Sequence, residues 1–319
     1  MKTVIILGAA GRIGDAAARA FVAAGWRVKG LARGGHGADL APEVEWVKAD
    51  AFDRAALTDA CAGADVVLNA LNPLYTEWEE KVLPMAENVI AAVEAAGATQ
   101  LLPGNVYNYG YDVGLAMRED AQQVPSTPKA RIRIDMETLF RRAAEERGVR
   151  TVVLRAGDFY GGTRPGAWLD GMILSKLAKD VIIWPGPMDL PHAFAYLPDL
   201  GRAFVQLAER REALPAFDTF HFEGHTLTGE AFKAATEEAV GRGLSRRGVP
   251  WILLRAGGIF MPMLRELSVM SYLWRMPHGL DGTKLRDLLG EVPTTEPVEA
   301  IRRSVADLGL DGRAARLAA

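Results

Sequence analysis

Short apolar runs and longer amphipathic runs alternate along the first half of the chain. The first apolar run, Val4–Leu7, ends in a glycine and is typical of a strand buried in a parallel sheet. The same pattern predicts further strands at 26–31, 44–47, 65–68, up to 101–102, and at 151–154. Helices are expected at 16–24, 77–96 and 128–147, each followed directly by a glycine. This alternation predicts an α/β fold, a Rossmann-type doubly wound parallel sheet covered by helices on both faces.

The second half of the chain is less regular. Proline and glycine at 185–187, and Pro191, predict loops. Helices are expected at 200–210, 228–240, 251–274, 284–289 and 297–308, and a strand at 217–222. This half is expected to form a smaller substrate lobe over the carboxyl ends of the parallel strands, where such sheets bind ligands. The predicted division is a nucleotide-binding domain at 1–165, to which 194–222 return, a substrate lobe at 166–193 and 223–311, and a tail at 312–319.

Composition narrows the class of protein. The 319 residues carry a formal net charge of -3 and one cysteine, Cys61, and the sequence pI is about 6.0. These values argue against bulk nucleic-acid binding. No run of eighteen apolar residues predicts a membrane span, so no membrane partner is expected. A single cysteine excludes an internal disulfide framework, and without a signal peptide the expected location is the cytoplasm.

Three glycines follow the first predicted strand at the spacing GxxGxxG. Gly8 lets the chain turn off the strand, and Gly11 lets the backbone approach a pyrophosphate at the helix N-terminus. Gly14 lets the helix pack closely on the strand. The strand–turn–helix context favours a dinucleotide site over a glycine turn that serves packing alone.

The end of the second predicted strand indicates which dinucleotide is bound. An NAD site has an acidic residue there, whereas this chain has Arg33, which suits a 2′-phosphate. Arg12 could share that phosphate, so NADP(H) is predicted in preference to NAD(H); the alternative for Arg33 is a solvated surface arginine. Asp50 could accept a hydrogen bond from the adenine amino group or cap a helix. Further cofactor contacts are expected at Ile13, Ala51, Ala70, Leu71 and Asn72.

Several segments together resemble the extended short-chain dehydrogenases/reductases of the NAD-dependent epimerase/dehydratase type. They are the loop at 8–14, with 48–53, 106–110, 154–161, 196–200, 281–285 and 289–290. The resemblance covers nearly the whole chain. It implies an NAD(P)-dependent oxidoreductase or epimerase that forms a homodimer through the helices at 77–96 and 128–147.

The chain departs from that family at the catalytic positions. The family uses a serine or threonine, a tyrosine acid/base and a lysine four residues after the tyrosine. The matching positions here hold Asn105, Lys129 and Arg133. Asn105 could donate a hydrogen bond to a carbonyl oxygen, as the serine would. Arg133 can hold ribose hydroxyls but cannot act as acid or base, because it is always charged.

Three interpretations of Lys129 stay open. It could be a proton donor whose pKa is lowered by Arg133, one helical turn away. It could hold an anionic substrate or a cofactor phosphate together with Arg131 and Arg133. It could also belong to a solvated basic face that begins the helix.

Other side chains offer protons or substrate contacts. Tyr107 is the first alternative proton donor and Tyr160 the second, although a buried tyrosine commonly packs its ring and ties down its hydroxyl. Asp158 follows the sixth strand and His192 lies near Pro191, so both are candidate substrate contacts together with Asn105, Tyr107 and Tyr160. The histidines of the segment 221–225 lie four residues apart, but a glycine breaks the helix that a metal site would need, so no metal is predicted.

The sequence thus predicts an NADP(H)-dependent oxidoreductase with a nonstandard catalytic triad. Its expected substrate is a small organic carbonyl or alcohol, anionic if the basic residues bind it. One alternative is a nucleotide-sugar epimerase/dehydratase, which the missing tyrosine weakens. Another is an NADP(H)-binding sensor or scaffold without catalysis.

Overall fold

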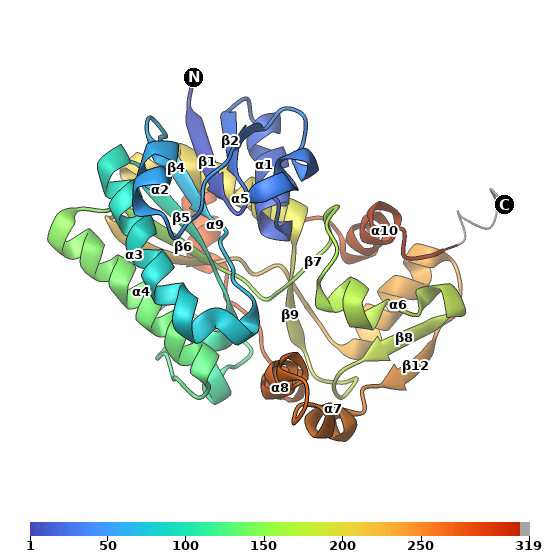
Figure 1. Ribbon diagram of the computed structural model, residues 1–319. Coiled ribbons are helices and arrows are strands. Elements are labelled where there is room, and N and C mark those ends of the chain that lie inside the picture. The colour runs from blue at the N-terminus through green and yellow to red at the C-terminus, as the bar shows by residue number, and fades with distance from the viewer. Residues whose placement is uncertain (313–319) are drawn as a thin grey trace.

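The computed structural model describes residues 1–312, and a seven-stranded parallel sheet forms the centre of its larger lobe (Figure 1). The strands are β1 Thr3–Leu7, β2 Arg27–Leu31, β3 Glu45–Val47, β4 Val66–Asn69, β5 Thr99–Gly104, β6 Thr151–Arg155 and β10 Phe217–His221. Their order is β10-β6-β5-β4-β1-β2-β3, so the direction of winding reverses between β1 and β4. The predicted doubly wound α/β fold is confirmed, and the reversal marks the edge at which such sheets bind ligands.

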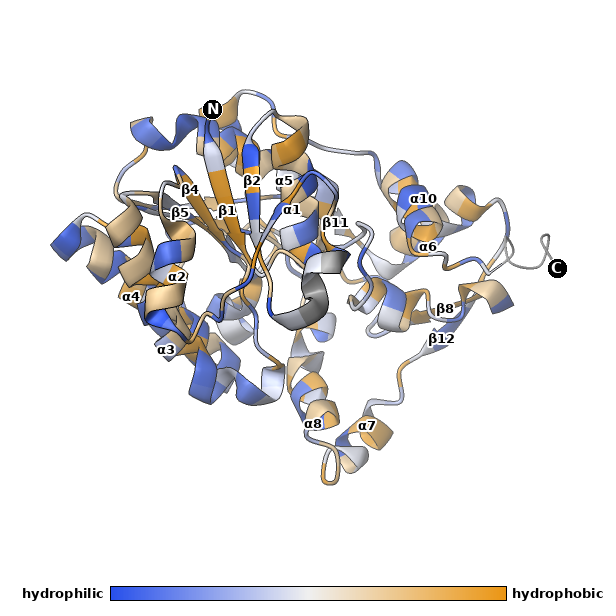
Figure 2. Cartoon of the chain, turned by 45° about the horizontal axis from the view of Figure 1, so that its top comes forward, coloured by the Kyte–Doolittle hydropathy of each residue, from blue (hydrophilic) through white to orange (hydrophobic). Residues whose placement is uncertain are grey.

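Helices cover both faces of this sheet. One face carries α1 Arg12–Ala23, α5 Leu197–Arg210 and α9 Thr283–Leu289, and the other carries α2 Arg54–Cys61, α3 Trp78–Ala96 and α4 Pro128–Arg147. The central strand β1 shows why: Val4 and Ile6 join the core under the first layer, whereas Ile5 and Leu7 join the core under the second. Side chains alternate between the faces of a strand, so a strand apolar throughout needs cover on both sides. Figure 2 shows β1 as a hydrophobic strand within the sheet.

The ends of α4 follow the sequence prediction, whereas α1 begins earlier than expected. The Thr127 hydroxyl accepts from the Ala130 N–H at 3.1 Å and caps α4, and Gly148 ends that helix with a φ of 70°. Helix α1 begins at Arg12 rather than at residue 16, because the glycine loop passes directly into helical backbone. Lys129 and Arg133 therefore lie in the first turns of α4, close to the carboxyl edge of the sheet.

The hydrophobic pattern predicted two helices of the smaller lobe, at 228–240 and 297–308, but none of its strands. Strands β7 Asp158–Tyr160, β9 His192–Tyr196 and β11 His225–Leu227 form one sheet, and β8 Val181–Trp184 pairs with β12 Ser245–Gly248 in another. Helices α6 Gly229–Val240 and α10 Pro297–Asp307 pack on each other beside these sheets. These strands have three to five residues, and β12 is exposed throughout, so neither length nor apolar alternation marks them.

The expected long helix at 251–274 is wrong. The structure has three shorter elements there: α7 Trp251–Gly257, α8 Pro262–Val269 and the 3-10 segment η7 Met270–Arg275. Glycines at 257 and 258 and Pro262 interrupt the helical backbone. Figures 1 and 2 show α7 and α8 projecting below the two lobes. Within residues 1–312, none of the helices combines the length and apolar character needed to span a membrane.

Candidate functional site

The glycine loop between β1 and α1 has room only for glycine. Gly8 has a φ of 80°, and a Cβ atom there would lie 2.9 Å from the Ala70 carbonyl oxygen. A Cβ atom on Gly14 would lie 2.3 Å from the Gly8 carbonyl oxygen. Gly11 precedes α1 and offers no side chain to cap it, which leaves the N–H groups of the first turn for an anion. This cradle fits the pyrophosphate of a dinucleotide.

The other predicted cofactor residues surround this loop at the carboxyl ends of β2, β3 and β4. Arg33 is exposed after β2, and the exposed Asp50 accepts from the Phe52 N–H at 3.0 Å. Asp53, rather than Asp50, caps α2 by accepting from the Ala56 N–H. The remaining residues are Ile13, Ala51, Ala70, Leu71 and Asn72, of which only Ala51 is fully buried. Their contacts with a cofactor stay predictions.

Arg12 reaches away from the loop toward the smaller lobe. Its guanidinium donates to the carbonyl oxygens of Gly166 at 2.7 Å and Phe159 at 3.1 Å. These hydrogen bonds hold Arg12 against the smaller lobe, and do not leave it free to share a phosphate with Arg33 as expected. The buried Nε of Arg12 has no hydrogen-bond partner among the described residues. Arg12 therefore joins the glycine loop to the smaller lobe, and its contact with a cofactor stays a prediction.

The structure brings together the three residues that replace the family's catalytic triad. Asn105 follows β5, and its Oδ1 accepts from the Tyr107 N–H at 3.0 Å, so its Nδ2 group is the remaining donor. Lys129 and Arg133 lie one turn apart on α4 and are both buried. Arg133 donates to the Pro103 carbonyl oxygen at 2.6 Å, while its buried Nε has no partner among residues 1–312.

This burial decides between two interpretations of the basic residues. A solvated basic face is wrong for Lys129 and Arg133, which are 3% and 9% exposed. Arg131 is exposed, because it lies on another face of the helix. Lys129 and Arg133 thus stay candidate site residues, and the structure does not place Arg131 with them.

Lys129 is held by contacts from two distant segments. Its ammonium forms an ion pair with Glu266 of α8, and lies 4.9 Å from the centre of the Tyr75 ring. Burial lowers the pKa of Lys129 to about 8, and the charge of Arg265 adds to this effect. The sequence pointed to Arg133 as the charge responsible, whereas the structure identifies burial and Arg265. Lys129 can therefore exchange a proton near neutral pH.

Tyr75 is a site residue that sequence reasoning missed. Its hydroxyl shares a hydrogen bond of 2.9 Å with the hydroxyl of Tyr107. Burial raises the pKa of Tyr75 and raises that of Tyr107 well above its ordinary value. Tyr75 follows β4 at the same edge of the sheet at which Asn105 follows β5. Its place after a predicted strand, at the ligand-binding edge of the sheet, could have identified Tyr75 from the sequence.

Asp158 and His192 meet on the side of the site that the smaller lobe provides. The Asp158 Oδ2 and His192 Nε2 atoms are 2.8 Å apart, and the His192 ring stacks on Trp274 with ring centres 3.9 Å apart. Tyr272 and His278, which follow the projecting helices, each hold a buried polar atom without a partner in the described chain. Next to Asp158 and His192 the structure thus adds Trp274, Tyr272 and His278, which the sequence analysis did not name as site residues.

Two tyrosines and two histidines fall outside the site. The Tyr160 hydroxyl is 2.7 Å from His225 Nδ1 and lies in the core of the smaller lobe, so Tyr160 as proton donor is wrong. The Tyr109 hydroxyl is 2.7 Å from His221 Nε2. Both histidines are thus engaged by separate tyrosines, and among the described residues no cluster of three or more possible ligands could hold a metal ion.

A buried ion pair between Arg155 and Glu137 holds the backbone of Asn105 in place. Arg155 forms an ion pair with Glu137 at 2.7 Å and donates to the Asn105 backbone carbonyl at 2.6 Å. Its guanidinium also lies 5.4 Å from the centre of the Tyr109 ring. Burial alone raises the pKa of Glu137, but the charge of Arg155 outweighs it and holds that pKa below its ordinary value. The pair fixes the backbone that positions the Asn105 side chain.

Two cavities flank these elements. One, of about 470 Å³, lies beside η7, and we name it the arginine groove. Its lining consists of Tyr111, Arg255, Arg265, Ser268, Val269, Ser271, Tyr272, Arg275 and Met276. The arginine groove shares Tyr272 with the candidate site, and Arg255, Arg265 and Arg275 lie at its border.

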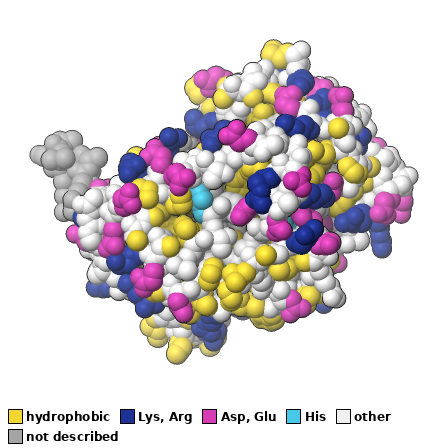
Figure 3. Space-filling model, turned by 180° about the vertical axis from the view of Figure 1, so that it is seen from behind, with side chains coloured by type: hydrophobic (Ala, Val, Ile, Leu, Met, Phe, Trp, Pro, Cys, Tyr) yellow, Lys and Arg dark blue, Asp and Glu magenta, His cyan; other side chains and the backbone are white. Residues whose placement is uncertain are grey.

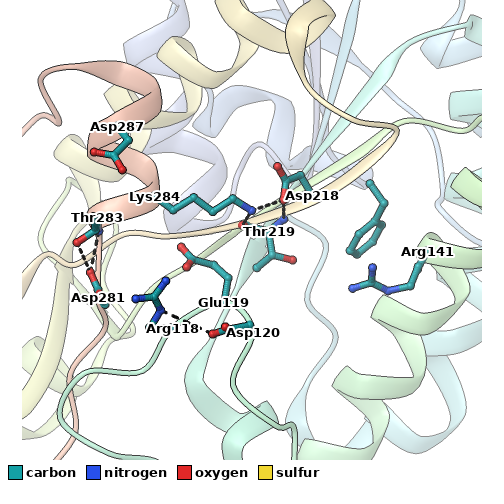
Figure 4. A pocket seen from close by; sticks show the side chains of 11 residues that line it. Arg118, Glu119, Asp120, Arg141, Asp218, Thr219, Asp281, Thr283, Lys284 and Asp287 are labelled. Carbon is teal, nitrogen blue, oxygen red and sulfur yellow. Dashed lines mark hydrogen bonds and ion pairs between the residues drawn. The ribbon is translucent and has the colours of Figure 1, made fainter.

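The second cavity, of about 490 Å³, lies between β10 and α9 (Figure 4). Half of its eight charged residues form ion pairs within the lining: Lys284 with Asp218, and Arg118 with Asp120 at 3.8 Å. The Arg141 guanidinium lies 4.1 Å from the centre of the Phe217 ring. None of the predicted site residues lines this cavity.

Comparison with known proteins places the chain in a family. Residues 4–221 match the model of the NAD dependent epimerase/dehydratase family. The dTDP-6-deoxy-L-talose 4-dehydrogenase (NAD(P)(+)) of Kitasatospora kifunensis is 29% identical over 185 residues, which are 54% of this chain and 58% of that protein. The match therefore spans less than two thirds of that relative.

Solved structures show the same fold over nearly the whole chain. The UDP-Glc/GlcNAc 4-epimerase of Campylobacter jejuni has a TM-score of 0.74 at 16% identity, covering 98% of this chain and 100% of that one. MoeE5 in complex with UDP-glucose and NAD has a TM-score of 0.75 at 18% identity, covering 98% and 99%. The resemblance seen in the sequence motifs, and the enzyme class that it implied, are confirmed. With its glycine cradle, its strand order and the match over residues 4–221, the chain belongs to the NAD dependent epimerase/dehydratase family.

Proposed function

We propose that this protein transfers a hydride between NADP(H) and a carbinol or carbonyl carbon of a nucleotide-activated sugar. The observation that carries the proposal is the buried pair Lys129 and Arg133, with the partly buried Asn105, beside the hydroxyl pair of Tyr75 and Tyr107. This set lies at the carboxyl edge of the sheet, next to the glycine loop, where a family member holds its cofactor.

The residues present fit a dinucleotide. The glycine loop would hold the pyrophosphate, and the unpartnered Nε of Arg133 suits a ribose hydroxyl. When bound, the nicotinamide supplies or accepts the hydride. The protein's own groups then have to orient the substrate oxygen and move its proton.

Two residues divide that work. The Nδ2 group of Asn105 donates to the substrate oxygen, as an oxyanion-hole donor does. Lys129 gives the proton to that oxygen in reduction, or takes it in oxidation, because its lowered pKa suits exchange near neutral pH. Tyr107 is less suited, since its raised pKa makes its proton hard to lose. Asp158 and His192 face the same space and would orient the substrate.

The arginine groove supports an anionic substrate. Arg255, Arg265 and Arg275 border it, and guanidinium groups bind diphosphates in bidentate geometry. The relatives named for dTDP-6-deoxy-L-talose, UDP-Glc/GlcNAc and UDP-glucose act on or bind such diphosphates. A second candidate, a small apolar carbonyl, is favoured by the aromatic side chains around Lys129 and His192, namely Tyr75, Tyr107, Tyr272 and Trp274.

A substrate panel tests this proposal. Oxidation of NADPH is followed by absorbance with 4-keto nucleotide sugars, and in parallel with aldehydes, ketones and quinones. Turnover of the nucleotide sugars supports the proposal, and turnover of the small carbonyls alone replaces it with the second candidate. Micromolar NADPH binding without any turnover would leave a sensor or scaffold as the function.

Cofactor choice is expected to depend on Arg33. In the Arg33→Asp variant we expect the Kd for NADP to rise about tenfold or more, because a charged hydrogen bond to the 2′-phosphate is lost, while NAD binding is kept. Fluorescence titration of both cofactors measures this. The matched control is Arg142→Asp, an exposed arginine on α4. Equal affinity of the wild-type protein for NAD and NADP would contradict the preference.

The rate of reduction is expected to follow the protonation of Lys129. Only the protonated lysine can donate, so kcat for reduction falls as pH rises through about 8, and kcat for oxidation rises through the same range. Glu266→Gln removes an opposite charge that favours the protonated form, so the midpoint should move to lower pH. Initial rates between pH 6 and 10 measure both effects. If the midpoint of the pH profile is the same in Glu266→Gln as in the wild-type protein, Lys129 is not the group whose protonation controls the rate.

The remaining expectations stay proposals. They are the homodimer formed through α3 and α4, the two-part division at residue 165 and the cytoplasmic location. The helices α3 and α4 pack side by side on one face of the sheet, which makes their outer surfaces available for pairing.

A further inference from the structure

The projecting segment 251–269, which we name the apolar hairpin, leaves large hydrophobic side chains in solvent. It consists of α7 and α8 with the turn between them. Phe260 is 85% exposed, and Ile252 and Ile259 are each 79% exposed. Leu253, Met261, Met263 and Val269 are exposed as well. Single exposed apolar residues are ordinary, but a run of seven in nineteen residues marks an interaction surface.

The hairpin is anchored at its ends and uncovered between them. Trp251 is buried and donates to the Pro185 carbonyl oxygen at 2.7 Å, and Met270 is buried where the chain re-enters the fold. Between these two residues, only Gly258 is fully buried. The inner side of α8 carries Glu266, which contacts Lys129. The exposed apolar residues therefore lie on a surface that the rest of the described chain does not cover.

Positive charge surrounds this surface. Residues 241–280 contain six arginines and one glutamate, with no aspartate or lysine, although the whole chain has a net charge of -3. The exposed pair Arg246 and Arg247 lies on the strand that leads into α7, and Arg255 and Arg265 lie on the helices themselves. Figure 3 shows hydrophobic side chains beside Lys and Arg side chains at the lower tip of the molecule.

The positive charge around the apolar hairpin favours one kind of partner over another. A second copy meeting this surface about a two-fold axis would bring the same arginines against each other, which is unfavourable. A bilayer with anionic lipids offers both an apolar interior for Phe260 and Ile259 and negative headgroups for the arginines. The mixture of aliphatic, aromatic and arginine side chains is that of segments that lie in a membrane interface.

We propose that the apolar hairpin docks this protein on the surface of an anionic phospholipid membrane. The tip, with Ile259 and Phe260, enters the boundary between headgroups and acyl chains. The exposed Arg246 and Arg247, which do not line the arginine groove, contact the headgroups. The sequence analysis expected no membrane partner because no apolar run is long enough to span a bilayer, but docking at the surface of a bilayer needs no such run. The proposal does not depend on the reaction that the protein catalyses.

Co-sedimentation with vesicles tests the proposal. The intact protein is mixed with vesicles of phosphatidylcholine alone, or of phosphatidylcholine with 30% phosphatidylglycerol. We expect binding to the anionic vesicles, weakened by 0.5 M salt and about tenfold or more weaker for I259S/F260S. Arg247→Glu should weaken binding about fivefold or more.

Matched variants control for general changes of surface. Leu115→Ser removes an exposed apolar residue elsewhere, and Arg302→Glu reverses an exposed charge on α10; both should bind as the wild-type protein does. NADPH titration checks that every variant is folded. Equal binding of I259S/F260S and wild type, or no binding to anionic vesicles, overturns the proposal. So does a concentration-dependent dimer in light scattering that I259S/F260S abolishes, because a second copy would then be the occupant.

Discussion

Replacing Lys129 with methionine is expected to lower kcat by about a hundredfold to ten-thousandfold, the range that a general acid contributes. Methionine keeps the length and apolar stem of the side chain, so the contact with the Tyr75 ring is retained in part while the proton is lost. Stopped-flow or steady-state NADPH oxidation with the substrate identified in the panel measures the change. Cofactor affinity should stay within a few fold, because Lys129 acts on the substrate oxygen.

Two further variants make this result specific. Arg142→Met, at an exposed position on the same helix, should leave kcat unchanged. Tyr107→Phe removes the hydroxyl that bonds to Tyr75 and should lower kcat by about tenfold or less, since a neutral hydrogen bond contributes about 1 kcal/mol. If Tyr107→Phe abolishes turnover while Lys129→Met retains it, the tyrosine is the proton donor and our assignment is wrong.

Removing Glu137 is expected to destabilise the fold by about 3–5 kcal/mol. The carboxylate is buried and pairs with Arg155, which is fully buried as well, so Glu137→Ala leaves a cation in the core without its partner. Urea unfolding followed by circular dichroism measures the free energy of unfolding. Glu145→Ala, at an exposed position on the same helix, should change it by less than about 0.5 kcal/mol.

The stability that the ion pair of Glu137 and Arg155 contributes is expected to fall at acid pH. The folded-state pKa of Glu137 lies below its ordinary value, so the stability that it contributes is present at neutral pH. That contribution is lost as pH falls from about 4.3, the pKa of a glutamate in the unfolded chain, toward the lower pKa of Glu137 in the folded protein. The double variant E137L/R155M replaces both charges and should be less destabilised than Glu137→Ala. A double variant that is less stable than Glu137→Ala would contradict the ion-pair explanation.

Much of the nucleotide-binding half followed from local pattern. The strand at Val4–Leu7, the glycine loop and the helix from Pro128 to Arg147 were predicted closely, because apolar runs, glycine turns and caps act over a few residues. The smaller lobe was predicted poorly for the same reason. Its strands are short: the loops predicted at 185–187 and at Pro191 are confirmed, but β8 and β9 on either side of them were not predicted.

The candidate site shows the same division between local and distant information. Asn105, Lys129 and Arg133 were located by matching positions to the family resemblance, and the structure joins Arg133 to the end of β5, next to Asn105, through the Pro103 carbonyl. The bond between Tyr75 and Tyr107 joins residues 32 positions apart, and the ion pair of Lys129 with Glu266 joins residues 137 positions apart. No periodicity connects positions so distant, so only the fold could show these contacts.

The sequence by itself determined the parallel sheet, the phosphate cradle and the replacement of the family's catalytic residues, since each depends on residue type and short spacing. Only the tertiary structure decided which polar groups are buried and what they meet. It lowered the pKa of Lys129 by burial, tied the Tyr160 hydroxyl to His225 and left the apolar hairpin uncovered. Burial and long-range contacts arise when distant elements pack together, and local pattern does not record that packing.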